Sequence, residues 1–378
     1  MTTVRLERAV VAADGTDPCS VTELFSPGLQ AWVAVDSLVD GMAMGGTRMT
    51  GTVSRQEVAQ LARAMSTKLA LAGLPIGGAK AGIRVGTGDR ETTLRAFGRV
   101  SSPLLHGGVY LGCDLGITHA DRDLFLAEAG YDVAQNPRVG RLPVDWGTLW
   151  THLADITGFG VCEAAAAAIR TRFGSRPCRV AIQGFGTVGR AVAKSLAERG
   201  HSVVAVADIR GTVEAREGLP VGHLLDLTDS AGVMDRTRMP DGVTVHGEPE
   251  AWLGVDADVL VLAADVDAIR ADNVRRVTAE VVVEGGNLCC TAEAKEMLAG
   301  QGVLLIPDVV ANVGAAAATG CVLTGTVPFG LALKPMVNWM FDWVGLRVRE
   351  NTEAAMELIA GGVTDPVPHL LAQRRTAW

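Results

Sequence analysis

A short apolar strand that leads directly into a glycine-rich turn is the feature that most constrains the fold of this chain. Val180–Ile182 precedes the turn Gly184-Phe-Gly-Thr-Val-Gly189, and a helix with apolar residues at helical spacing continues to Arg199. A second apolar strand, Ser202–Ala207, then ends at Asp208. This order of strand, glycine turn, helix, strand and acidic residue is typical of a dinucleotide-binding unit with a parallel sheet.

Each glycine has a separate task in such a turn. Gly184 permits the tight turn, Gly186 lets the backbone approach a pyrophosphate, and Gly189 allows close packing of helix and strand. Asp208 would accept hydrogen bonds from the adenosine ribose, which favours NAD. Arg210 could pair with a 2'-phosphate, so NADP is not excluded. A similar turn that binds no nucleotide is the alternative.

Three further apolar runs, at 258–264, 280–284 and 303–307, predict more strands of the same sheet. Near-continuous apolarity is typical of parallel strands buried on both faces. Ligands lie at the carboxyl ends of such strands, so the loops with Asn287 and Asn312 should border the nicotinamide. Both asparagines could instead be ordinary turn residues.

Residues 1–150 predict a different kind of unit. The sequence indicates a strand at 31–35, a Gly45-Gly46 turn, a helix at about 55–72 and a Gly77-Gly78 turn. A strand from Val109 follows. With 378 residues, the chain is long enough for about two domains.

Lysine is rare in this chain, and two of its five lysines lie in the first unit. Lys68 falls near the end of the predicted helix, Lys80 follows the second glycine pair, and Asp114 follows the strand from Val109. A buried lysine can lose its proton near neutral pH, whereas arginine cannot. These three residues are candidates for binding a carboxylate and moving a proton. A structural salt bridge is the alternative, and Lys194, Lys295 and Lys334 are expected to be ordinary helix or surface cations.

Charge and cysteine content exclude several functions. A net charge of -8, with acidic and basic residues interspersed, argues against nucleic acid or an anionic membrane as partner. The N-terminal residues lack the apolar segment of a secretory signal, so a cytoplasmic location is expected. Seven cysteines without paired spacing, and scattered histidines, predict reduced core thiols and no metal site.

Taken together, these motifs resemble the glutamate/leucine/phenylalanine/valine dehydrogenases over most of the chain. Gly45-Gly-Thr-Arg-Met49 is similar to the branched-chain and aromatic amino-acid enzymes, whereas Leu74–Gly82 is similar to the glutamate enzymes. Four more motifs match in the same order: Cys113–Gly116, Thr157–Val161, Val283–Asn287 and Ile306–Asn312.

The resemblance implies an α/β fold with two domains separated by an active-site cleft. Residues 1–150 would form the catalytic and oligomerisation domain, and 151–335 a Rossmann NAD(P)-binding domain. Helices in 336–378 would return to the first domain. A homo-oligomer, a dimer or larger, is expected.

The resemblance also implies roles for matching residues. Lys68 would bind the substrate carboxylate with help from Asn287, Lys80 would be the general base that activates water, and Asp114 would exchange protons with the amino group. The implied substrate site further includes Met44, Gly45, Gly46, Met65 and Thr319. The implied cofactor site comprises Thr157, Gly184, Phe185, Gly186, Thr187, Val188, Gly189, Asp208, Ile209, Arg210, Ala263, Ala264, Asn287 and Asn312.

The expected reaction is reversible oxidative deamination of an L-amino acid to a 2-oxo acid and ammonia. Met44 stands where the glutamate enzymes carry a lysine for the distal carboxylate, which favours a branched-chain or aromatic substrate. Asp265, in a loop that is usually less acidic, leaves an unusual biosynthetic amino acid open, and glutamate is a further alternative. A catalytically silent NAD-binding sensor or scaffold is the alternative of another class.

Overall fold

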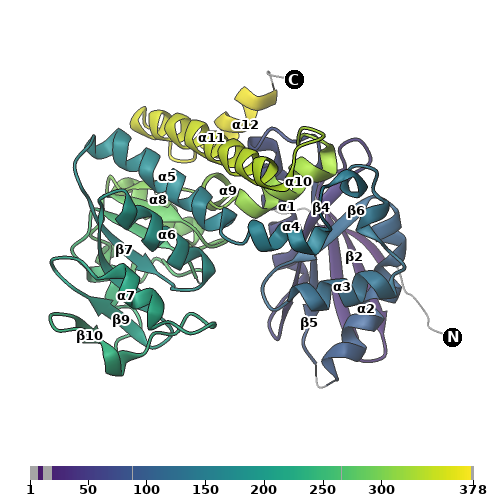
Figure 1. Cartoon of the computed structure of the whole chain (residues 1–378), viewed down its shortest axis with the longest axis horizontal. Helices are drawn as coiled ribbons and strands as arrows, with labels where there is room; N and C mark the ends of the chain where they lie inside the picture. Colours follow the sequence, from purple (N-terminus) through teal and green to yellow (C-terminus); the bar gives the residue numbers. More distant parts are fainter. Residues whose placement is uncertain (1–6, 12–18, 87, 265, 376–378) are drawn as a thin grey trace. The chain divides into compact units, whose positions relative to one another are not determined.

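The computed structural model divides the chain into two compact units, each built around its own sheet (Figure 1). It describes residues 7–11, 19–86, 88–264 and 266–375. Unit 1 contains Met1–His152 and Ala316–Val337, and unit 2 contains Leu153–Ala315 and Asn338–Trp378. Asp265 lies outside the described residues.

The C-terminal segment differs from the expected domain plan. Instead of returning to the first domain, the chain from Asn338 onward belongs to unit 2, while Ala316–Val337 belongs to unit 1. The reason is packing between α11 (Leu333–Ala360) and α5 (Ile156–Phe173). The rings of Phe159 and Phe341 meet edge to face with centroids 5.1 Å apart.

Unit 1 holds a six-stranded sheet in the order β1-β2-β3-β5-β4-β6. Strand β4 pairs in parallel with both β5 and β6, whereas β3 pairs with β5 antiparallel. The strands are β1 (Glu7–Val11), β2 (Cys19–Ser26), β3 (Leu29–Val35), β4 (Ala43–Thr50), β5 (Gly77–Arg84) and β6 (Val109–Cys113). The helices are α1 (Arg55–Leu71), α2 (Arg90–His106), α3 (His119–Glu128), α4 (Trp146–His152) and α10 (Gly314–Thr324), with short 3-10 turns at Val133–Gln135 and Val139–Arg141.

Helix α1 begins and packs as its sequence predicts. The side chain of Ser54 accepts a hydrogen bond from the Glu57 backbone N–H at 3.2 Å and caps the first turn. Val58 and Ala62 are buried against the sheet in one apolar cluster. The apolar stripe of α1 therefore covers the face of the sheet from which Lys80 projects, as the strand alternation from Gly78 indicates.

Both predicted glycine turns lie inside strands instead. Gly45-Gly46 is part of β4 and Gly77-Gly78 is part of β5. The physical reason is close approach by neighbouring segments, because a Cβ on Gly78 would lie 2.5 Å from the Ser66 hydroxyl of α1. Glycine in these strands marks tight packing rather than a change of direction.

Unit 2 holds a seven-stranded sheet in the order β10-β9-β8-β7-β11-β12-β13. Strands β8, β7, β11, β12 and β13 are parallel, and β9 and β10 add an antiparallel edge. The strands are β7 (Arg179–Gln183), β8 (Ser202–Asp208), β9 (Gly211–Glu214), β10 (Thr244–His246), β11 (Val259–Leu262), β12 (Val281–Glu284) and β13 (Leu304–Ile306). Besides α5 and α11, the helices are α6 (Thr187–Glu198), α7 (Val221–Asp226), α8 (Ala292–Gly300), α9 (Asp308–Ala311) and α12 (Val367–Arg375), with 3-10 turns at Arg236–Arg238, Ala251–Gly254 and Val274–Arg276.

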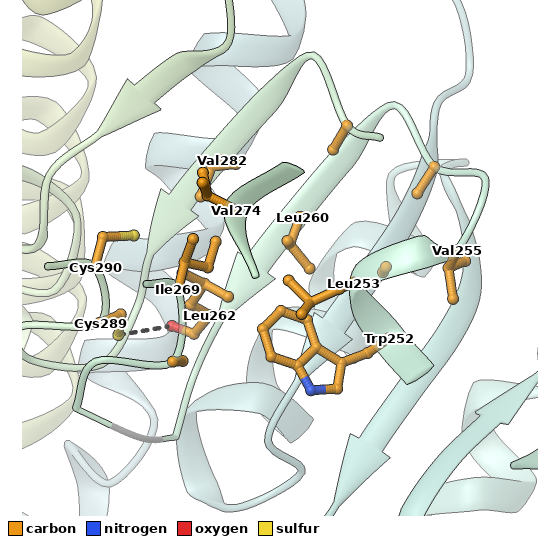
Figure 2. Packing of buried hydrophobic residues seen from close by; sticks show 14 of the residues in the cluster. Trp252, Leu253, Val255, Leu260, Leu262, Ile269, Val274, Val282, Cys289 and Cys290 are labelled. Atoms are coloured by element: carbon orange, nitrogen blue, oxygen red, sulfur yellow. Dashed lines mark hydrogen bonds between the residues drawn. The ribbon is translucent and has the colours of Figure 1, made fainter. Parts of the chain in front are cut away.

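One apolar cluster fills the core on one side of this sheet. Figure 2 shows Trp252 beside Leu253, and Cys289 and Cys290 at the opposite end of the cluster. The thiol of Cys289 contacts the Leu262 carbonyl oxygen at 3.7 Å (Figure 2). All seven cysteines are free, and six are buried, so the prediction of reduced core thiols is confirmed.

Candidate active site

Lys80 and Asp114 form an ion pair in unit 1. The Lys80 Nζ lies 2.9 Å from Asp114 Oδ2, and both side chains are largely buried. Lys80 belongs to β5 and Asp114 follows β6, and β4 separates these strands. The lysine side chain therefore reaches its partner across β4.

Gly46 leaves the space in which this pair forms. It lies opposite Gly112 in the register of β4 and β6. A Cβ on Gly46 would lie 2.6 Å from the Cys113 carbonyl oxygen and 2.9 Å from the Asp114 Cβ. Any larger side chain would displace Asp114, so the glycine pair of β4 shapes the site without contributing a functional group.

Arg48 and Glu57 complete the cluster, although neither was expected in the site from the sequence. Arg48 Nε donates to Asp114 Oδ2 at 3.1 Å, and its Nη1 donates to Glu57 Oε1 at 2.6 Å. Arg48 is only 4% exposed. The available signal was the alternation of β4, which places Arg48 on the same face as Gly46, two positions earlier.

The charge state of Asp114 follows from this geometry. Burial by itself raises the pKa of Asp114, but Lys80 and Arg48 outweigh burial and lower it well below its usual range. Burial likewise lowers the pKa of Arg48, while Asp114 and Glu57 raise it overall. The aspartate is thus a carboxylate at neutral pH, held by Lys80 and Arg48.

The other predicted substrate residues of unit 1 are also buried. Lys68 and Met65 lie on α1, Met44 on β4 and Thr319 on α10. Helix α10 packs beside the end of α1, since a Cβ on Gly320 would lie 3.2 Å from a methyl group of Leu69. The structure therefore brings the helix of Thr319 next to the helix of Lys68.

The glycine turn of unit 2 has the form that a pyrophosphate site requires. Gly184 has φ +93°, and a Cβ there would lie 2.6 Å from Ala264 Cβ, at the end of β11. Gly186 is the N-cap of α6 and, having no side chain, makes no side-chain cap hydrogen bond to the first turn. Phe185 is buried, while Thr187 and Val188 begin the helix. The first-turn N–H groups can therefore serve an anionic ligand.

The carboxylate of Asp208 is hydrogen-bonded within unit 2. Its side chain is 2% exposed and accepts hydrogen bonds from the backbone N–H groups of Met234 and Arg210, both at 2.7 Å. Arg236 also donates to it, from Nη2 to Oδ1 at 2.6 Å. These donors already satisfy the carboxylate that was expected to bind the ribose. Ile209, 89% exposed, and Arg210 are the accessible side chains at this strand end.

The two asparagine loops are joined by hydrogen bonds. The Asn312 Nδ2 donates to the Gly286 carbonyl at 2.7 Å, the Gly285 carbonyl at 3.2 Å and Asn287 Oδ1 at 3.2 Å. Asn312 Oδ1 is buried without a partner in the structure. The Nδ2 of Asn312 therefore orients Asn287. Elsewhere in unit 2, the Thr157 hydroxyl accepts a hydrogen bond from the Ala315 N–H at 3.1 Å.

A buried charge cluster supports these loops. Glu284, which is fully buried, accepts from the Cys290 N–H at 2.8 Å, the Asp308 N–H at 3.2 Å and Lys295 Nζ at 2.8 Å. Lys295, expected to be an ordinary helix or surface cation, lies on α8 and binds this buried carboxylate. Burial lowers the pKa of Lys295, but Glu284 raises it overall. Leu288, between these partners, has φ +54°, a conformation that side chains rarely adopt.

Among the described residues, no helix is long and apolar enough to cross a membrane. The same residues contain no group of three or more histidine, cysteine, aspartate or glutamate side chains placed to hold a metal ion.

Two family models match the chain. Residues 24–123 match the Glu/Leu/Phe/Val dehydrogenase dimerisation domain, and residues 151–323 match Glutamate/Leucine/Phenylalanine/Valine dehydrogenase. The NADP-specific glutamate dehydrogenase of Saccharolobus shibatae is 33% identical over 298 residues, which are 75% of this chain and 68% of that protein. The glutamate dehydrogenase of Thermotoga maritima is 33% identical over 289 residues, or 72% and 67% of the two chains.

Solved structures show the same fold. The hetero-hexameric glutamate dehydrogenase of Thermus thermophilus, in its leucine-bound form, aligns with a TM-score of 0.73 at 27% identity, covering 99% of this chain and 88% of that one. The L-tryptophan dehydrogenase of Nostoc punctiforme aligns with a TM-score of 0.61 at 24% identity over 94% of each chain, a likeness of fold alone. The chain therefore belongs to the glutamate/leucine/phenylalanine/valine dehydrogenase family, and it is an NAD(P)-dependent amino acid dehydrogenase.

Proposed function

We propose that this chain catalyses the reversible oxidative deamination of an L-amino acid to a 2-oxo acid and ammonia through Lys68, Lys80 and Asp114. The observation that carries the proposal is the buried ion pair of Lys80 and Asp114, 2.9 Å apart. Dinucleotide binding requires neither residue, and burial of charge is costly. A silent NAD-binding scaffold would have no use for this pair.

The proposed roles follow from the chemistry of the groups. Lys68, as a buried cation, binds the substrate carboxylate. Lys80, once deprotonated, accepts a proton from water while the water oxygen forms a bond to the imine carbon. Asp114 orients the Lys80 amine and exchanges protons with the substrate amino group. Loss of ammonia from the resulting carbinolamine then gives the 2-oxo acid.

The cofactor fits the uncapped first turn of α6 and the unpartnered oxygen of Asn312. When bound, nicotinamide supplies the hydride acceptor for the substrate Cα–H bond. The start of α6 and Gly186 would hold the pyrophosphate, and the alanines after β11, Ala263 and Ala264, would border the ring. Asn312 is then a hydrogen-bond donor to Asn287 and an acceptor toward the cofactor.

Glutamate is the first candidate substrate. The relatives from Saccharolobus shibatae and Thermotoga maritima are both named glutamate dehydrogenases. An apolar amino acid is the second candidate, because Met44, 3% exposed, offers a thioether and no cation to a distal carboxylate. Leaving that carboxylate unpaired costs about 1 to 3 kcal/mol. The proposed cofactor is NAD or NADP, and the match to a dimerisation domain supports a homo-oligomer.

Turnover across a panel of L-amino acids tests the proposal. We expect reduction of NAD or NADP by glutamate or by apolar amino acids, and near-complete loss of turnover in Lys80→Ala. Lys334→Ala, at an exposed position in α11, is the matched control and should retain wild-type turnover. Binding of cofactor without turnover of any amino acid would refute the enzyme reading. Preference for leucine over glutamate would select the second substrate class.

A further inference from the structure

We propose that Arg48, with Glu57 as its partner, is a positioning residue that keeps Asp114 charge-compensated when Lys80 releases its proton. This inference rests on the proposed role of Lys80 as the base. The contacts of Arg48 with Asp114 and Glu57 are observed independently of that role.

Lys80 and Arg48 share one oxygen atom of Asp114. Lys80 Nζ lies 2.9 Å from Oδ2, and Arg48 Nε lies 3.1 Å from the same atom. A guanidinium stays protonated throughout the working pH range of an enzyme, whereas an ammonium can titrate. One of the two cations is therefore permanent and the other is removable.

Release of the Lys80 proton would otherwise leave a buried carboxylate without a partner. The Nζ–H bond breaks, the proton passes to solvent water, and Asp114 keeps its negative charge. Because Arg48 still donates to Oδ2, the buried aspartate remains paired. Without Arg48, deprotonation of Lys80 would carry the cost of an unpaired buried charge and would need a higher pH.

Charge repulsion acts in the same direction. Two cations on one oxygen are close neighbours, and the Arg48 guanidinium disfavours a proton on Lys80. Both effects of Arg48 thus favour the neutral amine that can act as a base.

Glu57 has the opposite electrostatic effect but a supporting structural one. Its Oε1 accepts from Arg48 Nη1 at 2.6 Å, which leaves Nε directed at Asp114. Its negative charge also offsets part of the field of Arg48. Loss of the Arg48 charge and loss of the Glu57 charge should therefore shift the titration of Lys80 in opposite directions.

Other titratable or charged groups surround β5 and are held constant in the test. These are Asp36 after β3, Arg55, Arg63 and Lys68 on α1, Arg84 on β5, and Tyr110 and Cys113 on β6. Because they stay the same in every variant, differences between variants report on Arg48 and Glu57.

The direct test is NMR titration of the full-length enzyme labelled only in lysine. The chain has five lysines, so Lys80 can be assigned by loss of its signal in Lys80→Arg. We expect the pH at which Lys80 loses its proton to rise by about one unit or more in Arg48→Gln and to fall in Glu57→Gln. In Arg48→Lys, which keeps the charge, the pH at which Lys80 loses its proton should return most of the way to its wild-type value.

The rate profile is the second readout. The pH at which kcat/KM falls on the acid side should move with the Lys80 titration in each variant. The rate of Arg48→Gln should therefore be closer to the wild-type rate at high pH than at neutral pH. An unchanged Lys80 titration, or shifts of the same sign in Arg48→Gln and Glu57→Gln, would overturn the inference. A titration that moves as expected in an enzyme without turnover would instead overturn the proposed function alone.

A second variant covers the case in which Arg48→Gln does not fold because Glu57 is left without its cation. The double variant Arg48→Gln/Glu57→Gln removes both charges together. That double variant should still raise the pH at which Lys80 titrates, because Asp114 loses its permanent partner. A double variant with the wild-type titration would contradict the inference.

Discussion

The side-chain amide of Asn312 donates a hydrogen bond to the side-chain oxygen of Asn287, with 3.2 Å between the two atoms. The same Nδ2 also contacts the carbonyl oxygens of Gly285 and Gly286. One buried amide therefore fixes the loop that carries Asn287, and it fixes which end of the Asn287 amide faces outward.

Asn312→Asp should weaken catalysis while preserving the shape of the side chain. A carboxylate would face three oxygens where an amide N–H now donates, at a cost of about 1 to 3 kcal/mol. We expect a tenfold to hundredfold fall in kcat/KM for the amino acid, measured by steady-state kinetics. Asn136→Asp is the matched control, because its Oδ1 accepts from the Arg138 N–H and an aspartate oxygen can do the same. Equal losses in both variants would contradict the proposed role of Asn312.

Gly46→Ala should disrupt the ion pair of unit 1. The added Cβ would lie 2.9 Å from the Asp114 Cβ, so the aspartate or β4 must shift. We expect kcat to fall at least about tenfold with unchanged cofactor affinity, because the pair is proposed to act in proton transfer. Gly51→Ala is the control, since a Cβ there meets no atom within 4 Å. A Gly46→Ala enzyme with normal kcat would show that Asp114 tolerates displacement.

The sequence predicted the parts of this molecule that depend on local pattern. Apolar runs located the parallel strands of unit 2, and the glycine turn between β7 and α6 lies where its spacing predicted. Lys80 and Asp114 were predicted to act together, and they are in contact. The strands and the turn follow from periodicity and from a motif whose residues are close in the chain. The pairing of Lys80 with Asp114, which are distant in the chain, was implied by the family resemblance.

Features that depend on distant packing could not be read from the sequence. Gly46 was expected in a turn because its neighbours across the sheet, Cys113 and Asp114, are far away in the chain. The contact of Arg48 with Asp114 likewise joins residues 66 positions apart in the chain, although the alternation of β4 indicates which face Arg48 is on. The carboxylate of Asp208 accepts a hydrogen bond from Arg236, which lies 28 residues later in the chain. A sequence shows which side chains could pair, but tertiary contacts decide which of them do.

Glu163 should stabilise unit 2 in a pH-dependent way. Burial raises its pKa, but hydrogen bonds from Arg199 and Arg349 lower it overall. A lowered pKa in the folded state gives stability that is present above the unfolded value of 4.5 and lost as pH falls through the folded value. Glu163→Gln should therefore lower the free energy of unfolding by about 1 kcal/mol or more at pH 7. This difference should narrow below pH 4.5.

Urea unfolding of wild type and Glu163→Gln at pH 7 and at pH 4 measures this difference in the free energy of unfolding. Glu353→Gln is the control, because its ion pair with Arg170 is half exposed on both sides and contributes little. A Glu163→Gln difference that is as large at pH 4 as at pH 7 would assign the effect to packing rather than charge.

Met44→Lys should change substrate preference. The lysine would stand on β4 beside Gly45 and provide a cation for a distal carboxylate, at the cost of burying an ammonium where a thioether is now buried. We expect kcat/KM for glutamate to rise relative to leucine by about tenfold or more, since a paired carboxylate gains about 1 to 3 kcal/mol. Met44→Leu is the control for the change of side chain. A ratio that falls in Met44→Lys would place the distal carboxylate elsewhere.

Arg236→Met should shift cofactor preference toward NAD. The guanidinium of Arg236 now occupies the Asp208 carboxylate, and its loss would free oxygens that can accept hydrogen bonds from ribose hydroxyls. The freed negative charge would also repel a 2'-phosphate.

Arg210→Met should act in the same direction by removing an exposed cation. We expect the ratio of kcat/KM for NAD to that for NADP to rise at least about threefold in each, given that exposed ion pairs contribute up to about 1 kcal/mol. Arg238 is an exposed cation two residues beyond Arg236, so Arg238→Met is the control. A ratio that falls in Arg236→Met would mean that Asp208 does not face the ribose even when its carboxylate is free.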